Sequence, residues 1–340
     1  MPLTKAGGAY IMIKNTICSK TPSLVVNITD KCNMRCIYCP PNGENVEMSY
    51  CSSYDEIAVL QLIHLAKLEK LKMIRFTGGE PFLAPERLER FIFACKNDFS
   101  LVQINTNGIF DNYQFNWLVN YAKTLSLKFS LDTVCRDEFK SITQKDYLPR
   151  VLDNIEYAIS MGFEHISINT VLSIQSFENI KKLIEYAVSR KINVKFLTIS
   201  SYCGSVNVLT PNSLLEQIIS YLKTRSKNNG NAQLIGNRGI SMLTYQIENS
   251  LIYLVDHSYK KSKTPERTYF SSCKSNCSLF PCESGAISIN LSSNGCLSVC
   301  RGDKIKIGNV FFKNSDTINN LFQSALIQFN NCIKININNL

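Results

Sequence analysis

From Ser23 onward, short apolar runs alternate with longer segments in which apolar residues recur every three or four positions. The short runs predict strands, and the longer segments predict amphipathic helices. Strands are predicted at residues 24–28, 73–76, 102–105, 127–131, 165–170 and 194–199. Helices are predicted at residues 55–68, 85–95, 114–122, 149–161 and 177–190. This alternation, with almost continuously apolar strands, indicates an α/β fold in which helices cover a parallel sheet.

The number of these units indicates a partial barrel. Six βα units are too many for a small open sheet and too few for a closed barrel of eight. Residues suited to chemistry follow four of the strands directly, namely Cys32, Gly78, Asn107 and Asp132. Function at the carboxyl ends of strands is typical of TIM-type barrels. We therefore predict a partial (βα)6 TIM-type barrel over residues 23–225, with an N-terminal extension over residues 1–22.

Beyond residue 225 the periodicity weakens and turn residues become frequent. We predict a linker over residues 226–265, within which the apolar stretch 241–255 is ambiguous between helix and strand. Residues 286–291 and 297–299 flank the turn sequence Ser292-Ser293-Asn294-Gly295, which predicts a β-hairpin. We expect residues 266–340 to form a small cysteine-rich C-terminal domain.

Composition and charge exclude several classes of protein. The chain has no transmembrane-length apolar run, and residues 1–20 lack the features of a signal peptide, so we expect no membrane contact and a cytoplasmic location. The net charge of +10 favours an anionic substrate or partner, although a lysine-rich surface explains it equally well. No basic repeat with interleaved aromatic residues indicates binding to nucleic acid.

The cysteines are numerous and clustered. A reducing compartment disfavours disulfides, so 14 cysteines need another role. Three lie at 32–39 and five at 273–300, which indicates two metal sites. Cys32, Cys36 and Cys39 have the spacing C-x3-C-x2-C. A structural zinc site normally closes with four ligands, whereas three thiolates suit a 4Fe–4S cluster with one iron left open. A zinc or redox site is the alternative.

This spacing is followed, after the second predicted strand, by Thr77-Gly78-Gly79-Glu80-Pro81. Together the two motifs resemble the radical S-adenosylmethionine (SAM) superfamily. The resemblance implies that the three cysteines bind three irons of a 4Fe–4S cluster, and that the amino and carboxylate groups of SAM chelate the fourth. One electron then cleaves SAM to a 5′-deoxyadenosyl radical, which abstracts hydrogen from an unactivated carbon.

The resemblance also implies which residues bind SAM. Gly78, Gly79 and Glu80 are expected at its methionine end, where two glycines allow close approach of the backbone to the ligand. Tyr38 is expected near the adenine. Polar contacts with the ribose and carboxylate are expected from residues at successive strand ends, namely Asn107, Ser130, Asp132 and Asn169.

The second cysteine group has the spacing Cys282-x12-Gly295-x4-Cys300. This resembles the SPASM and twitch extensions, which carry auxiliary 4Fe–4S clusters in radical SAM enzymes acting on peptides and some sugars. The resemblance implies a second cluster held by Cys273, Cys277, Cys282 and Cys300. Cys296 and Cys332 remain alternatives as ligands, and a zinc knuckle remains the alternative to a cluster.

Residues 23–220 resemble the GTP cyclase of molybdenum-cofactor biosynthesis. That family binds triphosphate through C-terminal arginines, but Ala286, Ile287, Ser288 and Asn290 stand at the corresponding positions here, and neither Ser nor Asn replaces bidentate phosphate recognition. We therefore expect a radical SAM enzyme that modifies a peptide by a crosslink, a thioether or another change. It would need an external electron donor of the flavodoxin or ferredoxin type. A small metabolite, including a nucleotide in GTP cyclase-like chemistry, is the alternative substrate, and a non-catalytic iron–sulfur protein is the alternative class.

Overall fold

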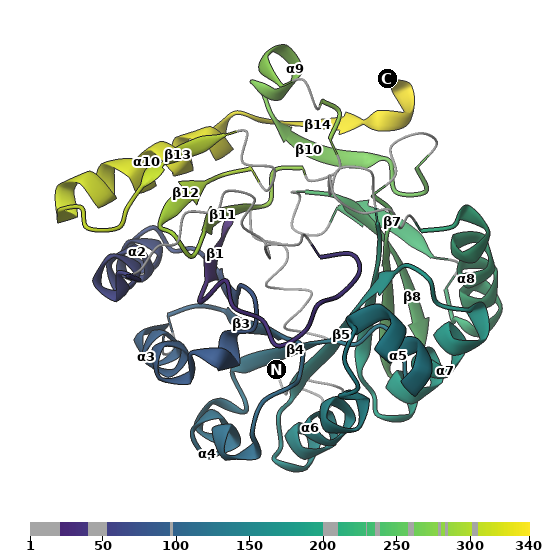
Figure 1. Cartoon of the computed structure of the whole chain (residues 1–340). Coiled ribbons are helices and arrows are strands. Elements are labelled where there is room, and N and C mark those ends of the chain that lie inside the picture. The colour runs from purple at the N-terminus through teal and green to yellow at the C-terminus, as the bar shows by residue number, and fades with distance from the viewer. Residues whose placement is uncertain are drawn as a thin grey trace, which may run out of the picture.

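Six parallel strands, each followed by helical structure, form the centre of the computed structural model (Figure 1). The structure describes residues 21–39, 53–95, 98–199, 210–228, 230–234, 239–257, 262–277, 280–282, 285–300 and 305–340. Most of the predicted N-terminal extension lies outside these ranges. The strands are β1 (Ser23–Asn27), β2 (Met73–Thr77), β3 (Leu101–Thr106), β4 (Leu125–Ser130), β5 (His165–Leu172) and β6 (Asn193–Thr198). The predicted partial (βα)6 arrangement is confirmed.

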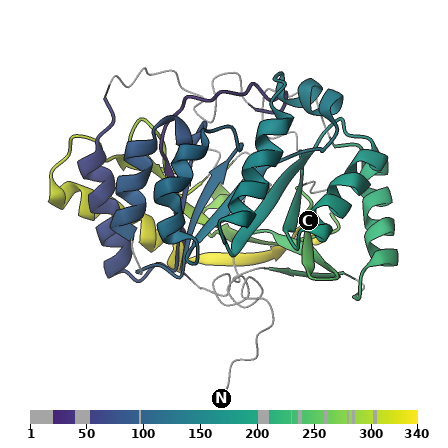
Figure 2. The same cartoon turned by 90° about the horizontal axis from the view of Figure 1, so that it is seen from below.

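The helices cover the outer face of this sheet. They are α2 (Glu56–Leu68), α3 (Pro85–Cys95), α4 (Phe115–Leu118), α5 (Arg136–Thr143), α6 (Leu148–Ser160), α7 (Phe177–Ser189) and α8 (Asn212–Arg225), with a short 3-10 helix at Pro81–Leu83. In Figure 2 the helices of the first two thirds of the chain stand side by side outside the strands. No helix in the described ranges is both long and apolar enough to cross a bilayer.

The two faces of the sheet differ in polarity. Outward side chains such as Phe76, Leu127 and Phe196 are fully buried under the helices. Alternate residues on the inner face are polar and mostly half-buried, as the strict alternation of β5 shows. Because successive strand residues point to opposite faces, the strands are mostly apolar toward the helices and mixed on the inner face, where Val25 and Leu197 lie among polar residues. This differs from the almost continuously apolar strands that we expected.

The sheet continues beyond β6. Strand β9 (Ser250–Val255) pairs parallel with β6, and β8 (Ser241–Ile247) and β7 (Asn231–Leu234) follow in antiparallel order. Residues 226–265 were predicted to be a linker, and the structure instead places three strands there. The turn-rich composition that suggested a linker is confined to the connection after α8. The apolar run of β9 is buried at every position, as expected for a strand covered on both faces.

The other edge of the sheet is extended by the C-terminal region. Strand β11 (Ser288–Leu291) pairs parallel with β1, and β12 (Cys296–Ser298) and β13 (Lys306–Asn309) follow it in antiparallel order. The predicted hairpin is thus present, but it belongs to the barrel sheet and not to a separate domain. Helix α10 (Ser315–Asn330) packs on α2, where Gln61 Nε2 donates to the Ser315 carbonyl at 2.9 Å.

A two-stranded ribbon spans the gap between the two edges of the sheet. It consists of β10 (Glu266–Phe270) and β14 (Cys332–Asn336), and the short helix α9 (Cys273–Asn276) follows β10. On one side Thr268 N donates to the Gly239 carbonyl at 2.7 Å, and on the other Ala286 N donates to the Thr268 carbonyl at 2.5 Å. Figure 1 shows β10 and β14 between β7 and β12. The cysteine-rich segment is therefore hydrogen-bonded to residues that precede β8 and β11.

Candidate functional site

The loop that carries Cys32, Cys36 and Cys39 begins as a continuation of β1 along the end of β2. Gly79 N donates to the Thr29 carbonyl at 2.7 Å, and Glu80 N donates to the Lys31 carbonyl at 2.8 Å. These two bonds fix the backbone immediately before Cys32. In Figure 2 this dark purple segment crosses one end of the strands.

The two glycines at residues 78 and 79 are required by this loop. A Cβ added to Gly78 would lie 2.2 Å from the Thr29 carbonyl oxygen, and one added to Gly79 would lie 1.9 Å from the Lys31 carbonyl oxygen. Gly78 also has a φ of +135°, which other residues rarely adopt. We expected the glycines to admit a ligand. In the structure the close approach that they permit is that of the cysteine loop itself.

The three thiols of this loop lie near one another. Cys32 and Cys39 are exposed, and Cys36 is half-buried. A hydrogen bond to Cys39, together with burial, raises the pKa of Cys36. Burial also raises the pKa of Cys32, and the charges of Glu80 and Cys39 add to that rise. The structure therefore brings the three sulfur atoms together at the carboxyl end of the barrel.

Asn107 holds the loop from the end of β3. Its Nδ2 lies 2.6 Å from Oδ1 of Asn33 and 3.6 Å from Sγ of Cys32, while its Oδ1 accepts from Ile109 N at 2.9 Å. We expected Asn107 to contact SAM. In the structure its side-chain amide is directed at the loop and at one of the three sulfur atoms. Asn33 was not among the predicted site residues. Its side chain adds a further bond between the loop and the end of β3 by donating to the Ile109 carbonyl.

Glu80 is fully buried, and its carboxylate is engaged within the protein. It accepts hydrogen bonds from Phe82 N at 3.1 Å, from the Thr106 hydroxyl at 2.8 Å and from Asn107 N at 2.6 Å. Burial raises the pKa of Glu80 to about 7, against these three donors, which favour the carboxylate. The carboxylate therefore joins the ends of β2 and β3. The backbone of Glu80 is engaged as well, because its N–H donates to the Lys31 carbonyl and its carbonyl accepts from Leu83 N at 3.0 Å.

Tyr38 and Asp132 form a second hydrogen-bonded connection between the cysteine loop and the strand ends. The Tyr38 hydroxyl donates to Oδ2 of Asp132 at 2.6 Å, and Val171 N donates to Oδ1 at 2.7 Å. Burial raises the pKa of Asp132 to about 6, and burial followed by the Asp132 charge raises the pKa of Tyr38. Both residues were expected beside SAM, at its adenine and ribose. The geometry shows that they join the cysteine loop to the ends of β4 and β5.

Ser130 and Asn169 face the inside of the barrel next to this connection. They are register partners on β4 and β5, and both are half-buried. The Oδ1 atom of Asn169 is buried and has no hydrogen-bond partner among the residues that the structure describes. An inward polar atom without a partner fits a site that a ligand completes. Among the residues expected to contact SAM, Asn169 is therefore the one with an unsatisfied hydrogen-bond acceptor available for a ligand.

The structure also assembles four cysteines of the second group. Burial raises the pKa of Cys273 to about 11, and the charges of Cys282, Cys277 and Cys300 add to that rise, so all four thiols share one neighbourhood. Cys296 lies on β12, and Cys332 lies opposite Phe270 in the ribbon. The described cysteines are all free thiols.

A buried arginine supports this second group. Arg267 is fully buried, and its guanidinium donates to the carbonyls of Cys282 at 3.1 Å and of Asp256 at 3.2 Å. The Tyr269 hydroxyl donates to the same Cys282 carbonyl at 2.5 Å. Arg267 was not among the predicted site residues, and its surroundings in the sequence, Glu266-Arg267-Thr268-Tyr269-Phe270, gave no signal for it. Its hydrogen bonds hold Cys282 in place.

The donor sets fit iron–sulfur clusters. Within the described ranges, no group of three or more His, Cys, Asp or Glu side chains is arranged so that it could hold a single metal ion. A cluster differs from a single ion because each thiolate binds its own iron. Three neighbouring thiols at the barrel end and four beside the ribbon provide the ligands that two such clusters require.

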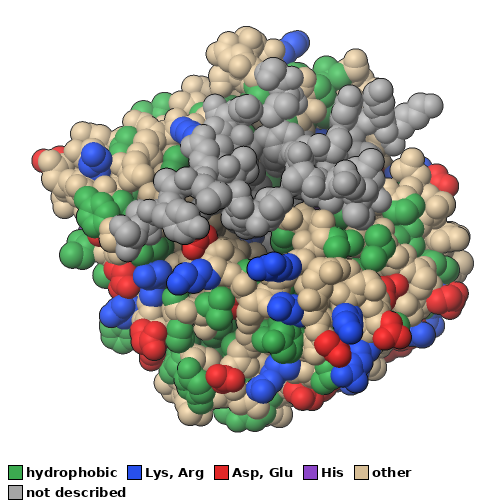
Figure 3. All heavy atoms as spheres, viewed as in Figure 1, with side chains coloured by type: hydrophobic (Ala, Val, Ile, Leu, Met, Phe, Trp, Pro, Cys, Tyr) green, Lys and Arg blue, Asp and Glu red, His purple; other side chains and the backbone are tan. Residues whose placement is uncertain are grey.

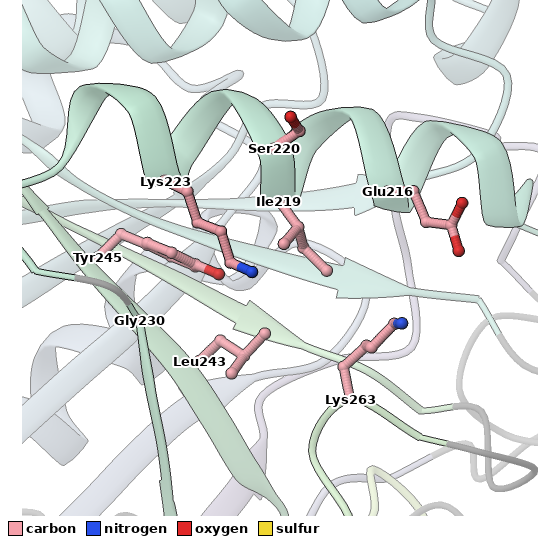
Figure 4. A pocket seen from close by; sticks show the side chains of 8 residues that line it. All are labelled: Glu216, Ile219, Ser220, Lys223, Gly230, Leu243, Tyr245 and Lys263. Carbon is pink, nitrogen blue, oxygen red and sulfur yellow. The ribbon is translucent and has the colours of Figure 1, made fainter.

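A separate pocket of about 450 Å³ lies on the outer side of the barrel, between α8 and β8 (Figure 4). Ile219 and Leu243 form its apolar floor, and Lys223 and Lys263 extend from its two sides. None of the predicted site residues lines it.

Comparison with known proteins finds a family match over part of the chain. Residues 26–187 match the Radical SAM superfamily. GTP 3′,8-cyclase from Clostridium botulinum (strain Hall) is 34% identical over 180 residues, which cover 49% of this chain and 54% of that protein. The same enzyme from Aliarcobacter butzleri is 35% identical over 187 residues, covering 52% and 55%. The chain thus spans about half the length of the curated relatives that it matches.

Two solved structures share the fold over most of this chain. Streptococcus suis SuiB bound to its precursor peptide SuiA has a TM-score of 0.61 at 17% identity, covering 91% of this chain and 67% of that one. The protein anSMEcpe with bound AdoMet has a TM-score of 0.58 at 15% identity, covering 90% and 82%. It has also been solved with AdoMet and the Kp18Cys peptide. Both likenesses extend well beyond the matched domain.

Proposed function

The chain carries a radical SAM domain over residues 26–187, and from this premise we propose that it is an enzyme whose cluster is bound by Cys32, Cys36 and Cys39. The observation that carries the proposal is the convergence of these three thiols at the carboxyl end of the barrel. A 4Fe–4S cluster bound there would supply the electron that cleaves SAM to a 5′-deoxyadenosyl radical.

The residues around the loop have separate tasks in this proposal. The glycine pair, Asn107 and the Tyr38–Asp132 bond would hold the loop that carries the three cluster-binding thiolates at the end of the barrel. Ser130 and Asn169 face the barrel interior and are proposed to bind SAM, Asn169 through its unpartnered Oδ1. Holding SAM and substrate in one enclosed space orients the radical and keeps water away.

Anaerobic reconstitution with iron, sulfide, SAM and a reductant tests the proposal. We expect 5′-deoxyadenosine from the wild-type chain and none from Cys36→Ser. Cys135→Ser is the matched control, because Cys135 is a half-buried thiol outside both groups. Absence of 5′-deoxyadenosine from an iron-loaded wild-type chain would leave the non-catalytic iron–sulfur alternative.

We propose a second 4Fe–4S cluster at Cys273, Cys277, Cys282 and Cys300, within residues 266–340. Their shared neighbourhood supports it, as does the fold shared with SuiB and anSMEcpe across the C-terminal region. Two clusters would give about eight irons per chain, and Cys282→Ala should lower this to about four. Cys296→Ala and Cys332→Ala test the remaining candidates. A wild-type chain that binds about four irons, or zinc, would contradict the proposal.

For the substrate we propose a peptide. This rests on fold analogy, since the architecture shared over about nine tenths of the chain is that of proteins solved with bound peptides. Identity with GTP 3′,8-cyclase favours a nucleotide as the second candidate. In the structure, however, Ala286 is fully buried and Ser288 hydrogen-bonds Asn290 at 2.7 Å, so β11 presents no cation for a triphosphate. Deuterium transfer from labelled peptides, or from labelled GTP, into 5′-deoxyadenosine decides between them.

The electron donor is proposed to be an acidic flavodoxin or ferredoxin. Cys32 and Cys39 are exposed, and the exposed cations Lys31 and Arg35 lie in the same loop. Figure 3 shows a band of Lys and Arg side chains across the middle of this face of the molecule. A positive surface near the cluster would steer an acidic donor toward it. The cytoplasm is the proposed compartment, because the cysteines of both groups must stay reduced to bind iron.

A further inference from the structure

The pocket between α8 and β8 is lined by side chains whose positions follow from the periodicity of the two elements (Figure 4). On α8, Glu216, Ile219 and Lys223 are spaced by three and four residues, so they lie on one face of the helix. On β8, Leu243 and Tyr245 are two residues apart and therefore lie on one face of the sheet. The volume of about 450 Å³ is within the range of small-molecule sites.

Tyr245 is held rigidly, but its hydroxyl has no partner. The side chain is 1% exposed, and a Cβ added to Gly230 would lie 2.4 Å from its ring, so the ring packs directly on the Gly230 backbone. Among the described residues, none forms a hydrogen bond with the Tyr245 hydroxyl, which lines the pocket. Burial raises the pKa of this hydroxyl. Because a buried hydroxyl without a partner is costly, this group fits a site that a ligand completes.

The charged side chains of the pocket are also unpaired. Lys223, Lys263 and Glu216 are exposed, and none of their charged groups forms an ion pair or hydrogen bond with another residue that the structure describes. In Figure 4 the Lys223 ammonium and the Tyr245 hydroxyl lie at one end of the pocket, while Glu216 and Lys263 lie toward the other. The second end carries both signs of charge. The first end, with a cation and a hydroxyl donor, is therefore the one that attracts an anion.

We propose that this pocket is a second ligand site and that it binds a small amphipathic anion, which is a molecule with an anionic group at one end of an apolar body. The carboxylate or phosphate group accepts hydrogen bonds from Lys223 and Tyr245, both of which are donors that suit either group. The apolar body covers Ile219 and Leu243. The inference goes beyond the proposed function, because the pocket shares no residue with the cysteine loop or with the residues proposed to bind SAM.

Isothermal titration calorimetry of the full reconstituted chain, without SAM, tests the proposal. The probes are hexanoate and hexyl phosphate, and we expect saturable binding of at least one, the tighter probe identifying the anionic group. Acetate and inorganic phosphate lack the apolar body, and 1-hexanol lacks the anion. Each of these three should bind about tenfold more weakly, or worse, than the probe that it matches.

Two variants test the anionic end of the pocket. Tyr245→Phe should weaken binding of the tighter probe by about tenfold or more, because a hydrogen bond to a charged group is lost. Its thermal unfolding midpoint without probe should not fall, since the hydroxyl has no bond to lose. Lys223→Met keeps the apolar stem and should weaken binding by about fivefold, as expected for an exposed ion pair. Lys313→Met, which replaces an exposed lysine just before α10, is the matched control and should retain full affinity.

Several results would overturn the proposal. If neither probe binds, the pocket holds only water. If hexanoate and 1-hexanol bind equally, no anion is recognised. If Lys223→Met and Tyr245→Phe bind the probes as tightly as the wild-type chain, the probes occupy another site. A larger loss in Lys263→Met than in Lys223→Met would overturn the placement of the anion. Because binding is measured without SAM, failure of this site and failure of 5′-deoxyadenosine formation are separate results.

Discussion

The hydroxyl of Tyr38 donates a 2.6 Å hydrogen bond to Oδ2 of Asp132, and this bond joins the cysteine loop to the carboxyl end of β4. Because Asp132 is 3% exposed, loss of the donor leaves a buried oxygen with no compensating water. The relationship makes Tyr38 a positioning residue for the neighbouring Cys36 and Cys39.

Tyr38→Phe should lower the free energy of unfolding by about 1–3 kcal/mol, because the Asp132 oxygen loses its partner. Denaturant titration of the metal-free chain measures this change. Tyr113→Phe is the control, since Tyr113 is 61% exposed and its hydroxyl is accessible to water. Equal effects of the two substitutions would show that the bond with Asp132 contributes nothing to stability.

Gly79→Ala should reduce iron binding at the first cluster. Its Cβ would lie 1.9 Å from the Lys31 carbonyl oxygen, so the backbone before Cys32 must move. Overpacking of this kind costs about 1–3 kcal/mol. Gly162→Ala is the comparison, because its Cβ meets no atom of the described residues within 4 Å although its φ is +81°. Gly162→Ala should lose stability but bind iron normally, and full iron binding by Gly79→Ala would contradict the prediction.

Asn107→Ala should make the midpoint potential of the first cluster more negative. Its Nδ2 lies 3.6 Å from Sγ of Cys32, and hydrogen bonds to cluster sulfurs tune the potential by stabilising the reduced, more negative state. Redox titration followed by electron paramagnetic resonance measures the shift. Asn112→Ala, at an exposed position, should leave the potential unchanged. A purely structural role of Asn107 would lower iron content without moving the potential of the clusters that remain.

Arg267→Met should destabilise the chain by roughly 1–3 kcal/mol and loosen the second cysteine group. The substitution keeps apolar volume but removes the donors to the carbonyls of Cys282 and Asp256. Denaturant unfolding curves measure the loss of stability, and the iron content of the chain measures the effect on the second cysteine group. Arg225→Met is the control, because Arg225 is exposed and pairs with Glu185 on the surface. Unchanged iron content in Arg267→Met would separate the arginine from the cluster site.

Because of His165, the free energy of unfolding should decrease as the pH becomes acidic. Burial lowers the pKa of His165 below its ordinary value of 6.5, so the folded chain binds fewer protons there than the unfolded chain. The contribution of His165 is therefore complete above pH 6.5 and is lost as the pH falls through the folded pKa. Unfolding free energies as a function of pH should show a smaller acidic decline for His165→Gln than for the wild-type chain. Parallel profiles would contradict this.

Much of the fold could be read from local patterns. The six strands, the helices between them and the hairpin around Gly295 each follow from periodicity or turn composition within a few residues. Cys32, Cys36 and Cys39 could be selected for the same reason, since their spacing is local. Short-range chemistry along the chain is sufficient for features of this kind.

Other features depend on partners that are remote in sequence. Strand β9 was read as part of a linker because its partner, β6, lies across the whole of α8 and two further strands. Strand β11 likewise pairs with β1 from the opposite end of the chain. Pairing at such distances is selected by the complete fold, and no local signal reports it.

The same division applies to the site. By itself, the sequence determined which thiols and glycines stand at the ends of the strands. Only the tertiary structure decided what surrounds them: Gly79 packs against the Lys31 carbonyl, and the Asn107 amide lies 3.6 Å from Sγ of Cys32. The physical reason is that the faces of a curved sheet acquire their neighbours only when it closes, and hydrogen bonds and charges act over those short distances.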